Sequence, residues 1–104
     1  MAQFDVYLNP NSETSETIPY LLDVQTDLLD MLATRVVAPL VLAEEMGPAA
    51  KQLNPKFKIK DTAVAMSTAE LAGIANRLLG DKVASLKSKR DEIIAALDLL
   101  FTGI

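Results

Sequence analysis

The clearest structural signal in this chain lies in residues 83–101, VASLKSKRDEIIAALDLLF. Apolar residues recur there at helical spacing and face away from charged ones. The apolar set is Val83, Leu86, Ile93, Ile94, Leu97, Leu100 and Phe101, and the charged set is Lys87, Lys89, Asp91 and Glu92. Ser85 or Ser88 can cap the start, and Gly103 stands where a left-handed residue commonly ends a helix. The pattern predicts an amphipathic C-terminal helix of about 14–17 residues.

The N-terminal residues predict a β-hairpin. Gln3–Leu8 alternates, with Phe4, Val6 and Leu8 on one face and Gln3, Asp5 and Tyr7 on the other. This alternation is typical of a half-buried strand. The polar stretch Asn9–Thr17 contains Pro10 and predicts a long loop. The apolar stretch Ile18–Val24 then forms the second arm of the hairpin.

The middle of the chain predicts further short strands. Gln25–Ala33 reads as a loop or one helical turn, and Arg35–Leu42 as a strand that Pro39 places at an edge or a bulge. Glu44–Gln52 forms a turn or short helix around Gly47-Pro48. Phe57–Lys60 and Ala63–Ser67 form a second hairpin, and Ala69–Leu79 is a strand with a bulge or a weak helix. We therefore expect a single domain over residues 1–104, mainly β, with four or five strands in a small antiparallel sheet or open barrel and one C-terminal α-helix.

Composition narrows the possible functions. The 104 residues are half hydrophobic and include no Cys and no His. Disulfides, thiolate nucleophiles, most zinc sites and the usual general base are therefore excluded, and we expect no metal and no cofactor. The start of the chain does not predict a signal peptide, and no apolar run is long enough for a membrane span. Together these features favour a cytoplasmic protein.

Charge is distributed unevenly along the chain. The net charge is −4, and residues 1–34 carry six acidic residues and no basic one. Direct binding to nucleic acid is disfavoured, because it requires a concentrated basic face. The acidic third predicts either solvated loops or a surface that meets a basic partner.

Several motifs together resemble the CcdB family. They are Gln3-Phe4-Asp5-Val6-Tyr7, Leu22-Asp23-Val24-Gln25-Thr26-Asp27-Leu28-Leu29-Asp30, Arg35-Val36-Val37-Ala38-Pro39-Leu40, Leu53-Asn54-Pro55, Met66-Ser67-Thr68 and Ala95-Ala96-Leu97-Asp98-Leu99-Leu100-Phe101-Thr102-Gly103-Ile104. The resemblance runs nearly end to end. Its most specific parts are the Asp-Val-Gln-x-Asp block and the terminal Phe-x-Gly-Ile.

The resemblance implies a toxin of a type II toxin–antitoxin module that is not an enzyme. Such toxins are homodimers with an SH3-like β-barrel and a long C-terminal helix. They bind the A subunit of DNA gyrase and trap the gyrase–DNA cleavage complex. A cognate, partly disordered CcdA-like antitoxin removes the toxin and represses the operon together with it. DNA is then contacted only through the antitoxin or gyrase.

The same resemblance implies two gyrase-binding segments. The first is the C-terminal end, with Phe101, Thr102, Gly103 and Ile104, and Asp98 one turn earlier. The second is the apolar pair Leu28 and Leu29, with Thr26 beside it. Without the resemblance, these residues read as a helix C-cap, a solvated acid and the packing of a loop against the core.

Thr102 departs from the family pattern. Gyrase-binding members carry Trp at this position, where the indole stacks on an arginine of gyrase. Truncation of such an aromatic residue lowers affinity by roughly 2–4 kcal/mol, or about 30- to 1000-fold. Weakened toxicity, a compensated interface and a different target all fit this departure, as does a homologue that mainly binds antitoxin.

The arginines allow a second class of function. Toxins on the same fold include ribonucleases that use Arg with hydroxyl or carboxylate groups. Arg35, Arg77 and Arg90 could serve in that way, but surface ion pairs are the simpler interpretation. The sequence shows no basic stripe or aromatic platform for RNA.

Overall fold

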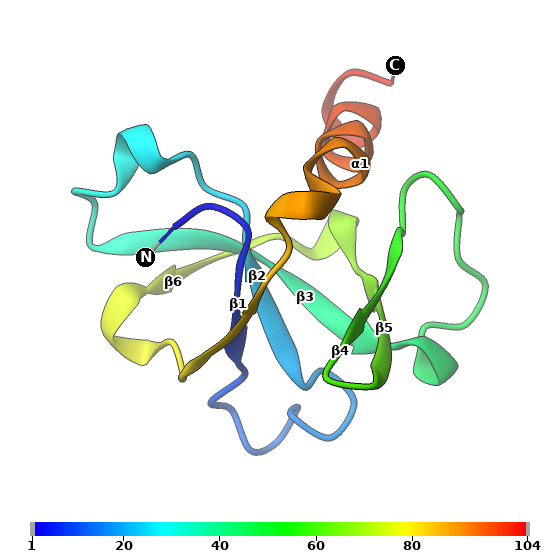
Figure 1. The fold of residues 1–104 in the computed structure, drawn as a ribbon, viewed down its shortest axis with the longest axis horizontal. Coiled ribbons are helices and arrows are strands. Elements are labelled where there is room, and N and C mark those ends of the chain that lie inside the picture. The colour runs from blue at the N-terminus through cyan, green and yellow to red at the C-terminus, as the bar shows by residue number, and fades with distance from the viewer. Residues whose placement is uncertain (1, 104) are drawn as a thin grey trace.

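Among the described residues, the chain forms a curled antiparallel sheet of seven strands and one C-terminal helix (Figure 1). The structure, a computed structural model, describes residues 2–103. The strands are β1 (Asp5–Leu8), β2 (Tyr20–Asp23), β3 (Thr34–Leu42), β4 (Lys56–Ile59), β5 (Thr62–Met66), β6 (Ala72–Ala75) and β7 (Lys82–Ser85), and the helix is α1 (Arg90–Thr102). The expected mainly-β fold with a C-terminal helix is confirmed, whereas the expected four or five strands were too few.

Both predicted hairpins are present. The strand order is β4-β5-β3-β2-β1-β7, and β6 pairs with the first half of β3. β1 pairs with β2, and β4 pairs with β5 through a turn at Lys60 and Asp61. Both turn residues have positive φ, as a two-residue hairpin turn of type I′ requires. The loop before β3 contains the single helical turn η1 (Asp27–Leu29), and η2 (Ala43–Glu45) follows β3.

Pro39 lies inside a central strand, so its predicted position at an edge or bulge was wrong. Residues 34–37 of β3 pair with β6, and residues 40–42 pair with β5. Pro39 falls between these two partners, where its carbonyl accepts a hydrogen bond from Ser67 N at 2.9 Å. The N–H and C=O of a residue in an antiparallel strand point to the same side. The side on which Pro39 lacks an N–H is therefore the side on which β3 changes its partner from β6 to β5. On its other side, the pairing of β3 with β2 is intact.

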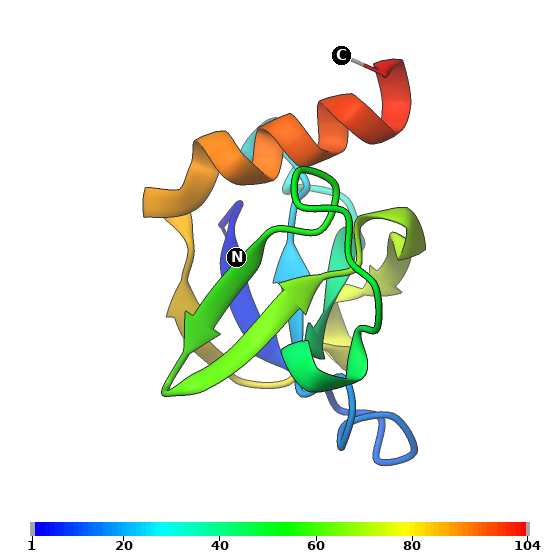
Figure 2. The same ribbon diagram turned by 90° about the vertical axis from the view of Figure 1, so that its right-hand side faces the viewer.

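The main core lies between α1 and the sheet. Figure 2 shows α1 lying across the curled sheet. Ile93 and Ala96 on the helix are fully buried against strand residues. Those strand residues include Phe4, Val6, Leu22, Val24, Ala38, Leu40, Phe57, Ile59, Val64 and Met66. Burial of this apolar area is the main favourable term for the fold.

The opposite face of β1 is buried as well, contrary to the expected half-buried strand. Asp5 and Tyr7 are almost fully buried, whereas Leu8 is exposed. β7 pairs with β1 while β6 pairs with β3, so the chain between β6 and β7 bends around this face (Figure 1). Leu8 N donates to Asp81 O in that connection at 2.9 Å. The curl of the sheet thus covers a face that a flat sheet would leave in solvent.

The C-terminal helix is shorter than expected at its start. α1 has 13 residues and follows the short turn η5 (Lys87–Lys89), while Val83 belongs to β7. Neither serine caps α1, because its N-cap residue is Lys89 without a side-chain hydrogen bond. Ser85 instead accepts a hydrogen bond from Lys87 N at 3.3 Å. The predicted end is confirmed, with Gly103 in the left-handed conformation.

The segment over Ala69–Leu79 combines both predicted alternatives. It begins in the turn η3 (Thr68–Glu70), continues as the four-residue strand β6 and ends in the turn η4 (Asn76–Leu78). Within the part of the chain that the structure describes, no helix is long and apolar enough to cross a membrane.

Candidate functional site

The loop between β2 and β3 carries the predicted residues Thr26, Leu28 and Leu29. The Thr26 hydroxyl accepts a hydrogen bond from Leu28 N at 3.3 Å and so starts the turn η1. None of the residues of η1 is buried, and the Leu28 side chain is 82% exposed. Packing of Leu28 against the core is therefore excluded, and this side chain is available to a partner.

Other apolar side chains in and beside the same loop are also exposed. Met31 is 75% exposed, and Leu29, Leu32 and Val36 are partly exposed. Single exposed apolar residues are common on protein surfaces, but a group of them usually marks an interaction site. The sequence reasoning missed Met31, Leu32 and Val36. The signal for Met31 and Leu32 was a density of large apolar residues in a stretch too short and too acidic to form a strand or helix of its own. Val36 lies on β3, and its exposure had no such local signal.

The second predicted segment is the end of α1. Phe101 is 69% exposed, and Asp98 and Thr102 are exposed beside it. Gly103 has φ +74° and its N–H donates to Leu99 O at 3.1 Å. The helix cap and an exposed aromatic residue therefore coexist in this segment. Ile104, the last predicted residue, lies outside the described residues.

The two segments remain separate within one chain. In Figures 1 and 2 the loop between β2 and β3 and the end of α1 both lie toward the same end of the molecule. Figure 1 also shows that they project from different places on it. The structure brings Leu28 and Leu29 together, and it brings Asp98 and Phe101 together, but it does not join the two pairs.

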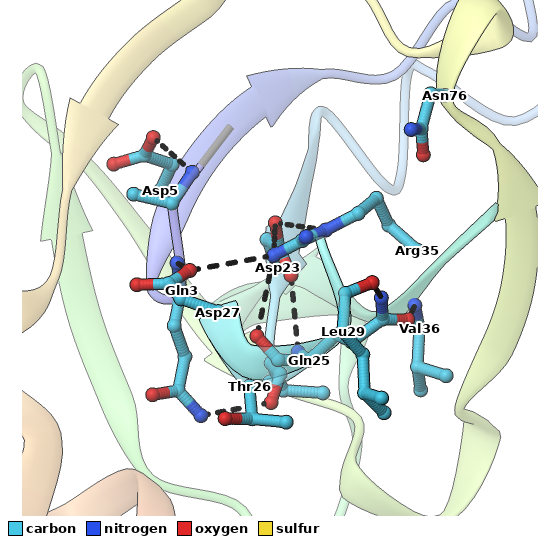
Figure 3. A network of polar contacts seen from close by, with 12 residues as sticks. Gln3, Asp5, Asp23, Gln25, Thr26, Asp27, Leu29, Arg35, Val36 and Asn76 are labelled. Atoms are coloured by element: carbon cyan, nitrogen blue, oxygen red, sulfur yellow. Dashed lines mark hydrogen bonds and ion pairs between the residues drawn. The ribbon is translucent and has the colours of Figure 1, made fainter. Parts of the chain in front are cut away.

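A buried ion pair lies beneath the loop (Figure 3). Arg35 on β3 and Asp23 on β2 are fully buried, with Nη2 and Oδ2 2.8 Å apart. Arg35 Nε also donates to Asp23 Oδ2 at 2.8 Å. Burial raises the pKa of the Asp23 carboxyl, and the hydrogen bond from Arg35 opposes that rise. Arg35 Nη1 has no hydrogen-bond partner among the described residues.

The position of Arg35 corrects two expectations. This arginine forms a buried pair, and a side chain without solvent access cannot reach an RNA substrate. Arg77 and Arg90 are exposed. The acidic N-terminal third is not entirely solvated either, because Asp5 and Asp23 are buried.

The described residues offer no metal centre. Across residues 2–103, no group of three or more Asp and Glu side chains is placed to hold a metal ion. The features that stand out are apolar side chains in solvent, at the loop before β3 and at the end of α1. Such features are typical of a surface that binds another protein.

The fold is thus a small curled antiparallel sheet with one C-terminal helix and two exposed apolar segments. A model of the CcdB family, described as CcdB protein, matches residues 3–103. The match covers nearly the whole chain, and the chain belongs to the CcdB family. This membership points to the toxin of a toxin–antitoxin module.

Proposed function

We propose that this protein is a toxin that binds the A subunit of DNA gyrase and traps the cleaved gyrase–DNA complex. The observation that carries the proposal is the exposure of Leu28 and Phe101, at 82% and 69%. Exposure of large apolar side chains is unfavourable in an isolated protein, so both segments suit a surface that is covered in a complex. These are also the two segments that the resemblance to the CcdB family assigns to gyrase.

The proposed active form is a homodimer. Gyrase A subunits form a symmetric dimer, and two equivalent toxin segments related by a two-fold axis match two equivalent sites. The C-terminal ends of the two protomers would lie near this axis. Sedimentation equilibrium should give twice the mass of 11.2 kDa at micromolar concentration. A chain that stays monomeric would contradict the symmetric arrangement.

A cognate CcdA-like antitoxin is the second proposed partner. A net charge of −4 does not suit direct contact with DNA, so the antitoxin would supply the basic surface in the repressing complex. The toxin alone should leave its operator fragment unshifted in an electrophoretic assay at physiological salt. A shift by the toxin alone would overturn this division of roles.

We propose that the toxin acts by binding and performs no covalent chemistry. The burial of Arg35 supports this over a ribonuclease, because it removes one of three arginines from any substrate. A long RNA incubated with the protein should remain intact. Cleavage that disappears in Arg77→Ala would establish the ribonuclease instead.

Binding to the isolated gyrase A subunit, measured by calorimetry, tests the proposed interface. Leu28→Asp and Phe101→Ala should each weaken binding about tenfold or more, because buried apolar anchors dominate protein interfaces. Lys58→Ala is the matched control, since Lys58 is exposed on β4, and Figure 1 shows this strand away from the loop before β3 and from the end of α1. Equal losses in all three variants, or none, would contradict the interface. A protein that binds only antitoxin and does not arrest growth when expressed alone would establish a detoxified homologue.

A further inference from the structure

The loop between β2 and β3 is held by polar contacts instead of apolar packing. Its turn η1 buries no residue, and Leu28 and Met31 extend into solvent. Apolar burial therefore contributes little to fixing the conformation of residues 26–33. Hydrogen bonds at the two ends of the loop must decide how its apolar side chains are presented.

Gln25 joins the start of the loop to its far side. Its Nε2 donates to Leu29 O at 3.0 Å, and its Oε1 accepts from Val36 N at 3.0 Å. The Gln25 side chain is buried. One amide group thus links the turn that carries Leu28 and Leu29 to the strand that follows the loop (Figure 3).

The buried ion pair fixes Gln25 in turn. Asp23 Oδ1 accepts from Gln25 N at 3.0 Å, and Arg35 Nη2 donates to Gln25 O at 3.2 Å. The same Arg35 nitrogen lies 3.7 Å from Asp27 Oδ1, which also accepts from Gln3 N at 2.7 Å. The start of the loop is therefore anchored to β2, to β3 and to the N-terminal residues.

Asn76 holds the end of the loop from a different part of the chain. The main-chain N–H of Asn76 donates to Ala33 O at 2.9 Å, and its side-chain Nδ2 donates to Leu32 O at 3.1 Å. Asn76 begins the turn η4 and follows β6, which pairs with β3. The two carbonyls that it binds directly precede β3, so Asn76 sets where the loop ends.

We propose that Gln25 and Asn76 are positioning residues for partner binding. They hold residues 26–33 in the conformation that presents Leu28 and Leu29, and Gln25 is buried too deeply to meet the partner itself. The inference rests on the proposed function only for the identity of the partner. A loop released from either amide spends part of its time in conformations that cannot bind. The observed affinity then falls in proportion to the fraction of molecules that remain competent to bind. Loss of one or two hydrogen bonds predicts about tenfold weaker binding.

Amide hydrogen exchange and calorimetry with the gyrase A subunit test this assignment together. In Asn76→Ala, which removes the side-chain donor without adding a charge, exchange should rise across residues 26–33 and affinity should fall about tenfold. Gln25→Ala should do the same if it folds. The thermal midpoint of Asn76→Ala should stay within a few degrees of wild type, because Asn76 lies outside the core.

Asn9→Ala is the matched control. Asn9 Nδ2 donates to Ile18 O at 2.9 Å, so this variant loosens the separate loop over residues 9–18. It should raise exchange there and leave gyrase binding unchanged. Unchanged exchange over residues 26–33 in Asn76→Ala would overturn the proposal, as would higher exchange with unchanged affinity. If wild type does not bind the A subunit, the proposed function fails, and the exchange result alone decides whether Asn76 holds the loop.

Discussion

The hydroxyl of Thr102 donates a hydrogen bond to the main-chain carbonyl of Asp98 at 2.7 Å. The side chain of Thr102 is therefore bonded back to its own helix, one turn earlier. A threonine bonded in this way offers a partner its methyl group and the acceptor lone pairs of its hydroxyl oxygen, but no free donor. Among the described residues at the end of α1, the apolar contact must come mainly from Phe101, which is 69% exposed.

Replacement of Thr102 by Trp should strengthen binding to gyrase. The indole adds a large contact area and a face on which an arginine can stack. Thr102 is exposed, so the larger side chain meets no packing in the free protein. We expect about 30- to 1000-fold higher affinity in calorimetry with the gyrase A subunit. An unchanged affinity would mean that this segment does not meet gyrase in the family manner.

The buried pair of Asp23 and Arg35 should be essential for stability. Asp23→Asn leaves the buried Arg35 guanidinium with only the half-exposed Asp27 carboxylate, 3.7 Å away, as a counter-charge. Removal of one partner of a buried pair typically costs about 3–5 kcal/mol. Urea unfolding followed by circular dichroism measures this loss. A loss below about 1 kcal/mol would show that the pair contributes little, as exposed pairs do.

Lys82 provides the comparison for that experiment. Its Nζ lies 3.3 Å from Asp5 Oδ1, but the Lys82 side chain is 56% exposed. Water screens the Lys82 ammonium, and the buried Asp5 carboxylate keeps its hydrogen bond from Ala2 N at 3.1 Å. Lys82→Met should therefore change the free energy of unfolding by about 1 kcal/mol or less. Equal losses in Asp23→Asn and Lys82→Met would contradict the claim that burial makes the difference.

The exposed apolar side chains should be dispensable for folding. Leu28→Ala and Phe101→Ala are expected to change the free energy of unfolding by only about 0.5 kcal/mol, because neither residue is packed. Ile93→Ala, at a fully buried position on α1, should cost about 2–5 kcal/mol. Urea unfolding gives all three free-energy changes from the shift in midpoint, provided that the dependence of the free energy on urea concentration is the same as in wild type. A large loss in Leu28→Ala would show that this side chain packs within the free protein.

Tyr7 should make stability depend on alkaline pH. Burial and the negative charges of Asp5 and Asp23 raise the pKa of the Tyr7 phenol above its ordinary 10.0. Its contribution to stability is therefore fully present below pH 10.0 and is lost as the pH rises through the folded-state pKa. In Tyr20→Phe, which leaves Tyr7 as the only tyrosine, phenolate absorbance should appear with a midpoint above 10.0. A midpoint at or below 10.0 would contradict the burial of this phenol.

The sequence predicted those elements whose signals are local. The end of α1 followed from apolar periodicity and from Gly103, and both hairpins followed from alternation between turn residues. β7 was missed because Val83 and Leu86 also fit helical spacing. Its strand conformation comes from pairing with β1, which lies near the other end of the chain.

Candidate site residues came from the sequence only where a motif carried them. The resemblance supplied Leu28 and Phe101, and the structure shows both exposed. The partnership of Arg35 with Asp23 depends on the register of β2 and β3 and on the curl that covers their outer face. The charge composition of the chain does not reveal which strands pair, so a surface ion pair was predicted for Arg35.

The most direct test of the proposed function is the gyrase cleavage assay. Supercoiled plasmid is incubated with DNA gyrase, ATP and the purified wild-type protein, and cleaved complexes are released with detergent and protease. Linear DNA should accumulate with increasing protein, and Thr102→Trp should produce it at a lower concentration. If neither protein yields linear DNA at high micromolar concentration, while an established gyrase poison does, gyrase is not the target of this toxin.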